Sequence, residues 1–118
     1  GSHGMDHASW RRMDALTAMR ELVEARDRLV ATVGAPGTEA ACPRGQYDRR
    51  ALQQLRQAGY DAVHTSDRAR ASAGAWLQPR FSVLNDDTAA TIQRDVLAPP
   101  PAARRLERSA ARLVKRLR

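Results

Sequence analysis

Hydrophobic residues recur at intervals of three and four along the first third of the chain, which is the spacing of one face of an α-helix. Ser9 or Asp14 precedes them as a candidate N-terminal cap. Gly34 follows them, and glycine is the residue that most often ends a helix. The predicted inward positions are Leu16, Met19, Leu22, Val23, Leu29, Val30 and Val33.

Three short apolar runs further along the chain predict β-strands. They cover residues 38–42, 62–65 and 81–84, and Pro79 and Arg80 introduce the third. Such runs are as long as a buried strand and too short for a helix. The sequence therefore predicts three strands.

Helical segments separate and follow these strands. One covers residues 48–60, with Asp48 as its cap, Leu52 and Leu55 inward and Gly59 as its end. Another begins at Asp86 or Asp87 and ends at Leu97, before three consecutive prolines. Alternating strands and helices are typical of right-handed crossover units on a parallel sheet. Three strands cannot close such a sheet, so we expect part of a larger α/β domain.

Length and composition predict one hydrophobic core. The chain has 118 residues, 42% of them hydrophobic and only 4% aromatic, so we expect an aliphatic interior. No apolar run approaches the ~18 residues of a membrane span, and no signal sequence is recognisable. The single cysteine, Cys42, excludes an internal disulfide and a multi-cysteine zinc site, and a small buried thiol is the expected role.

The net charge of +7 is concentrated at the C-terminus. From residue 103 onward the chain has seven basic residues and one acidic residue, and the remainder is close to neutral. The pattern over residues 102–118 predicts a basic helix. We expect its apolar stripe to pack on the domain and its charged side chains to lie in water. An anionic membrane surface or an acidic partner is the alternative; nucleic acid is not expected, because no basic patch with aromatics lies elsewhere. The stripe consists of Leu106, Leu113, Val114 and Leu117.

Two of the three histidines, His3 and His7, lie four residues apart at the start of the chain. On a helical turn this spacing places both imidazoles on one face, within reach of a single metal ion. Gly-Ser-His before Met5 is also what a cleaved purification tag leaves behind, so the motif alone has two interpretations. His64, in an otherwise apolar strand, is expected to be structural.

The segment ACPRGQYDRRALQQLRQAGYDAVHTSD, with the histidine pair before it and WLQPRFSV after it, resembles the polysaccharide deacetylase family, the family-four carbohydrate esterases. The resemblance implies the later portion of a distorted (β/α) barrel over residues 1–101, followed by the basic helix 102–118. It also implies that a leading strand with a pair of aspartates precedes Gly1 and that the N-terminus is missing. A bacterial cytoplasm or cell envelope is the expected location, and no oligomeric state is predicted.

In such a family the reaction is hydrolysis of the N-acetyl amide of an amino-sugar glycan by metal-bound water. The resemblance assigns His3 and His7 to a divalent metal, most simply zinc, and leaves the third ligand and the base to the leading aspartates. Asp6 is not expected to replace them, because adjacent residues do not share a helix face. We therefore expect no activity from this chain alone.

The resemblance also assigns a site to the turn after the first strand. The backbone amide of Arg44 takes the position of the oxyanion donor, and Pro43, Gly45 and Tyr47 the positions that contact the glycan. A histidine that many members carry on a late strand is replaced by Pro79-Arg80. Arg80 is expected to orient a catalytic carboxylate or to pair with one structurally, with Asp67 as the candidate partner.

Overall fold

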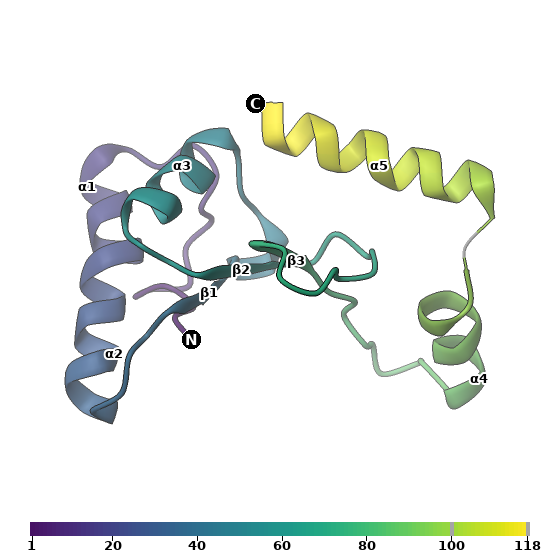
Figure 1. Ribbon diagram of the computed structural model, residues 1–118, viewed down its shortest axis with the longest axis horizontal. Helices are drawn as coiled ribbons and strands as arrows, with labels where there is room; N and C mark the ends of the chain where they lie inside the picture. The colour runs from purple at the N-terminus through teal and green to yellow at the C-terminus, as the bar shows by residue number, and fades with distance from the viewer. Residues whose placement is uncertain (100, 118) are drawn as a thin grey trace.

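Three parallel strands form the centre of the fold (Figure 1). The computed structural model describes residues 1–99 and 101–117. The strands are β1 (Glu39–Ala41), β2 (Ala62–Thr65) and β3 (Leu77–Pro79), in the order β1-β2-β3. Helix α3 (Arg49–Gln57) connects β1 to β2, as parallel pairing requires. Strands and helices alternate, which confirms the predicted fold class.

The first predicted helix is present but presents a different face to the core. It consists of α1 (Ala15–Ala18), the π-helical segment η1 (Met19–Glu24) and α2 (Ala25–Val33). Asp14 caps it by accepting from the Thr17 amide at 2.7 Å, and Gly34 ends it with a φ of 70°.

The predicted inward stripe of this helix is wrong at three positions, because Leu16, Met19 and Val33 are exposed. The side chains that are buried are Ala18, Glu21, Leu22 and Ala25. The amide of Ala25 donates to the Arg20 carbonyl, five residues back instead of four. The residues after this point are therefore rotated about the helix axis, relative to the positions that a regular 3.6-residue repeat predicts.

Aromatic side chains hold the core, contrary to the aliphatic interior expected from composition. Trp10 and Tyr47 are the largest fully buried residues, and their backbones pair as an isolated parallel bridge. Leu55 on α3 is also fully buried, as predicted. Few aromatics are present, but their large surface makes each one dominate the packing.

A third strand is present, but it lies before the predicted residues 81–84. Pairing with β2 involves Leu77–Pro79 and is extended by the Trp76 carbonyl, which accepts from Val63 at 2.7 Å. Beyond this, only the Arg80 amide still donates to β2, at the Thr65 carbonyl. Residues 82–84 are exposed, because β2 has ended and offers no further partner.

Two helical elements follow the sheet: α4 (Ala89–Ile92), which continues as η3 (Gln93–Leu97), and α5 (Ala102–Leu117). Thr88 caps α4, instead of Asp86 or Asp87. Figure 1 shows α4 and α5 on the β3 side and α1 and α2 on the β1 side. Among the described residues, no helix has the length and apolar character needed to cross a membrane.

The apolar stripe of α5 does not pack on the domain, so that expectation is wrong. Its four side chains are between 47% and 76% exposed: Leu106, Leu113, Val114 and Leu117. The helix is instead attached through polar contacts of Arg108 and Lys115 with the loops that follow β1 and β2.

Gly34 and Gly45 both have a backbone φ in the left-handed region, so replacing each by alanine separates backbone strain from side-chain packing. A Cβ on Gly45 would lie 2.7 Å from Ser66 Cβ, whereas one on Gly34 would meet nothing within 4 Å. We expect Gly34→Ala to cost about 1 kcal/mol of unfolding free energy, from backbone strain alone. Gly45→Ala should cost roughly 1–3 kcal/mol more, because of overpacking. Urea denaturation measures both, and equal losses would contradict the close approach.

Candidate functional site

The carboxyl edge of the sheet collects the chemically interesting residues. Ser2 pairs in parallel with Ala40, through hydrogen bonds of 2.8 Å to Glu39 and Ala41, so His3 follows directly at this edge. The turn 43–45 follows β1, and Asp67 follows β2. Because parallel strands end on the same side, these segments meet there, where α/β proteins place their ligands.

His3 and His7 lie together, with ring centroids 4.7 Å apart and ring planes tilted by 60°. His3 Nδ1 is 2.7 Å from the carbonyl oxygen of Ala41. A carbonyl only accepts hydrogen bonds, so Nδ1 carries a proton, and in the neutral ring Nε2 then has the lone pair. Metal-binding histidines are commonly held in this way. Both side chains are exposed.

A loop brings the two rings together, and the predicted helical turn is absent. Residues 1–14 contain no helix, and Gly4 and His7 have φ values of 84° and 54°. The spacing therefore predicted the proximity of the histidines correctly but assigned it to the wrong backbone conformation.

Glu21, a buried carboxylate, organises this loop. Its side chain is 1% exposed, and its oxygens accept from the Asp6 amide at 2.9 Å and from Trp10 Nε1 at 3.4 Å. A Cβ on Gly4 would lie 2.2 Å from Glu21 Oε2, so the loop fits closely around the carboxylate. Sequence reasoning missed Glu21, although its place among the inward positions of the first helix was a signal.

Asp6 points away from the histidine pair. Its carboxylate pairs with Arg20 at 2.9 Å, and both side chains are more than half exposed. In residues 1–99 and 101–117, no three His, Cys, Asp or Glu side chains group closely enough to hold a metal ion. The described chain therefore brings together two potential ligands and no third.

The turn after β1 has two consecutive residues in the left-handed region, Arg44 and Gly45, with φ values of 53° and 64°. The amides of Gly45 and Gln46 donate back to Cys42 and Pro43 and close the turn. The Arg44 amide has no hydrogen-bond acceptor within the described part of the chain, and the Arg44 side chain is exposed. A rigid turn with one free amide donor can stabilise a developing oxyanion.

Asp67 is the centre of a second buried network. Its side chain is 1% exposed and accepts from Tyr47 Oη at 2.6 Å, from Thr65 Oγ1 at 2.9 Å and from Lys115 Nζ at 2.6 Å. Lys115 also donates to the Gly45 carbonyl at 3.3 Å and so connects α5 to the turn. Tyr47 is 2% exposed and serves to hold the carboxylate.

The pKa values of Asp67, Tyr47 and the neighbouring Cys42 are shifted. Burial alone would raise the pKa of Asp67, but the hydrogen bonds from Lys115, Tyr47 and Thr65 and the Lys115 charge outweigh it and hold that pKa below its ordinary value. Burial and the Asp67 carboxylate raise the pKa of Tyr47. Burial, then Asp67, raises the pKa of Cys42 to about 12, so the thiol is inert, as expected.

Two further predictions concern Arg80 and His64. Lys115, and not Arg80, is the cation bound to Asp67, and Arg80 is exposed. The signal for Lys115 was that it is the only lysine among 20 basic residues. The Nε2 atom of His64 lies 2.9 Å from Glu39 Oε2 on the neighbouring strand, and its structural role stays a prediction.

Comparison with known proteins gives a match to one protein family. The sequence model described as polysaccharide deacetylase matches residues 1–63, which include both histidines and the turn 43–45. No curated protein matches the chain significantly.

A solved structure, the Streptococcus pyogenes deacetylase PplD in complex with acetate, matches the fold with a TM-score of 0.70 at 20% identity. The match covers 82% of this chain and 43% of that one, so this chain spans less than half the length of that deacetylase. It supports a partial α/β domain.

Replacing Glu21 tests the buried carboxylate. Glu21→Gln turns one of two acceptor oxygens into a donor that faces a buried N–H group, so we expect a loss of roughly 1–3 kcal/mol in unfolding free energy. Glu24→Gln, at an exposed position of η1, is the matched control and should stay within about 0.5 kcal/mol. Equal losses in urea denaturation would show that Glu21 does not organise the loop.

The lowered pKa of Asp67 predicts an acid-sensitive contribution to stability. Because the folded pKa lies below the unfolded one, this contribution is present above about pH 4 and is lost as the pH falls through the folded pKa. The unfolding free energy of Asp67→Asn should therefore fall less than that of the wild type below pH 4. Asp61→Asn, at an exposed position, should keep the wild-type pH dependence. Parallel curves for all three proteins would contradict the prediction.

Proposed function

Because the chain belongs to the polysaccharide deacetylase family, we propose that it supplies part of the active site of a metal-dependent hydrolase that removes N-acetyl groups from amino-sugar glycans. The observation that supports this most directly is the histidine pair. Its rings lie 4.7 Å apart at the carboxyl edge of the sheet, and His3 Nδ1 is bound to a backbone carbonyl. Both features suit a metal site that opens to a substrate.

In this proposal, His3 and His7 are two of the three protein ligands of a divalent cation, most simply zinc. Their neutral imidazole donors suit zinc, and the bond of His3 to Ala41 keeps Nε2 available. A bound cation would polarise the acetyl carbonyl and lower the pKa of a water molecule. The family resemblance assigns the third ligand to an aspartate.

The turn after β1 would serve the substrate. The Arg44 amide donates a hydrogen bond to the oxygen of the acetyl carbonyl as its negative charge develops. Pro43, Gly45 and Tyr47 are all buried, so they contribute by fixing this turn beside the glycan. Tyr47 does so through Asp67, which Lys115 joins to the Gly45 carbonyl.

Arg80 has a separate place in the proposal. It follows β3 at the same edge, and its guanidinium is exposed and available to orient a carboxylate of the complete site. Its backbone amide, bound to Thr65, keeps it at this edge.

Zinc titration of the chain tests the proposal. We expect saturable binding in isothermal titration calorimetry and at least a tenfold loss of affinity in His3→Ala and in His7→Ala, because each removes one of two ligands. His64→Ala is the matched control, since His64 pairs with Glu39 on the far side of β1 from Ser2, and it should bind as the wild type does. Unchanged binding in both His3→Ala and His7→Ala would contradict the metal site.

A further inference from the structure

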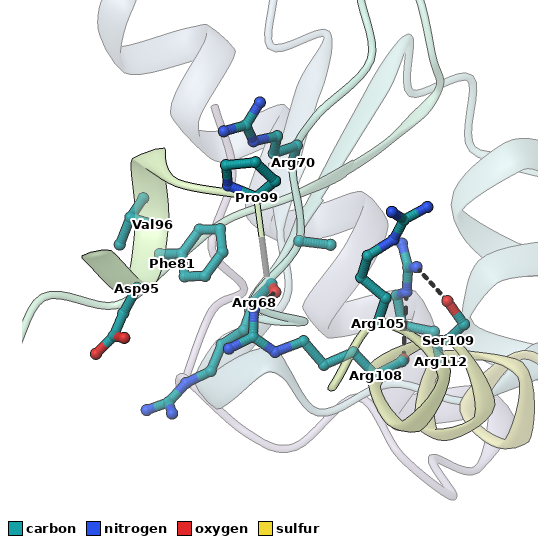
Figure 2. Close-up of a pocket in the computed structure, with 11 residues that line it drawn as sticks. Arg68, Arg70, Phe81, Asp95, Val96, Pro99, Arg105, Arg108, Ser109 and Arg112 are labelled. Atoms are coloured by element: carbon teal, nitrogen blue, oxygen red, sulfur yellow. Dashed lines mark hydrogen bonds between the residues drawn. The ribbon is translucent and has the colours of Figure 1, made fainter. Parts of the chain in front are cut away.

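Arginine side chains from separate segments line a cavity of about 370 Å³ between the loop after β2 and α5 (Figure 2). Phe81 and Pro99 form part of its apolar wall. The arginines are Arg68, Arg70, Arg105, Arg108 and Arg112.

The positive charge of this arginine pocket is not balanced by its own lining. Asp95 is the acidic residue among the eleven that line it, and its carboxylate is bound by Arg94 at 3.0 and 3.1 Å. The lining thus has five arginines and one carboxylate, which a sixth arginine, Arg94, already engages. Like charges collected in this way produce a strongly positive local potential.

Neutral groups orient three of the five guanidiniums. Arg108 donates to the carbonyl of Arg68 at 3.0 Å and lies over the Phe81 ring, 5.6 Å from its centroid. Arg112 donates to Ser109 Oγ at 3.1 Å, as Figure 2 shows, and Arg70 donates to the Leu97 carbonyl. These contacts orient the side chains without neutralising them, and each guanidinium has five N–H donors, so donors remain for a ligand.

The arginine pocket belongs to the same edge of the sheet as the histidine pair. Arg68 directly follows Asp67 after β2, and Phe81 follows Arg80 after β3. Both places therefore border the edge along which the proposed glycan would lie. Shape also matters: a carboxylate is satisfied by one planar guanidinium, whereas a tetrahedral phosphate presents oxygens in several directions and suits arginines from several segments.

We propose that the arginine pocket binds a phosphate group carried by the glycan substrate. This inference rests on the proposed deacetylase function and adds to it a substrate class, a phosphate-bearing N-acetylated glycan. A concave pocket of about 370 Å³ has room for a phosphate together with the sugar that carries it, which distinguishes it from the flat basic face that binds a membrane or a nucleic acid.

Inorganic phosphate titrated into the full chain without metal, at constant ionic strength, is the first test. We expect saturable binding by calorimetry that weakens about tenfold in Arg105→Gln, the fold-change of one lost charge-assisted hydrogen bond. Arg28→Gln, an equal charge change at an exposed position on α2, is the control and should bind as the wild type does. Absent binding, or equal losses in both variants, would overturn the proposal.

The source of the phosphate is tested with four competitors. N-acetylglucosamine 6-phosphate should displace inorganic phosphate, and N-acetylglucosamine should not. Stronger competition by phosphatidylglycerol vesicles or duplex DNA would overturn the assignment to a glycan. His3→Ala should leave phosphate binding unchanged, so a failure of the arginine pocket and a failure of the metal site give different results.

Discussion

A buried carboxylate must be surrounded by hydrogen-bond donors, and this constraint shapes the carboxyl edge of the sheet twice. Glu21 is enclosed by the loop that carries His3 and His7, whose amide and indole donors satisfy it. Asp67 takes donors from Tyr47, Thr65 and Lys115. Removing either carboxylate would leave buried donors without acceptors, so each one determines the backbone around it.

The two networks act on different parts of the proposed site. Glu21 lies in η1, which precedes β1, and it sets the conformation of the loop that carries His3 and His7. The Asp67 network connects the strand end to the turn that holds the Arg44 amide, since Lys115 bridges Asp67 and the Gly45 carbonyl. The imidazoles and the amide donor are therefore positioned by two buried carboxylates.

Local signals predicted much of the fold. Asp14 and Asp48 cap helices, and Gly34 and Gly59 end them, because capping depends only on neighbouring backbone groups. The predicted position of the third strand was wrong, because the residues that can pair with β2 depend on where β2 ends. The histidines were found by their spacing, but their loop conformation depends on Glu21, fifteen residues beyond Asp6, and periodicity carries no such information.

The basic C-terminal helix illustrates the limit of a charge count. Read as a pattern, its arginines are a solvated face opposite an apolar stripe. In the structure the stripe is exposed, and the basic side chains make the contacts: Lys115 enters the Asp67 network, while Arg105, Arg108 and Arg112 line one pocket with Arg68 and Arg70. Attachment by cations of which few have a carboxylate partner among the described residues concentrates positive charge beside the carboxyl edge of the sheet. A role in stability alone does not account for that arrangement, because arginines held close together repel one another and so destabilise the fold. With an anionic ligand bound, the same charges would be stabilising.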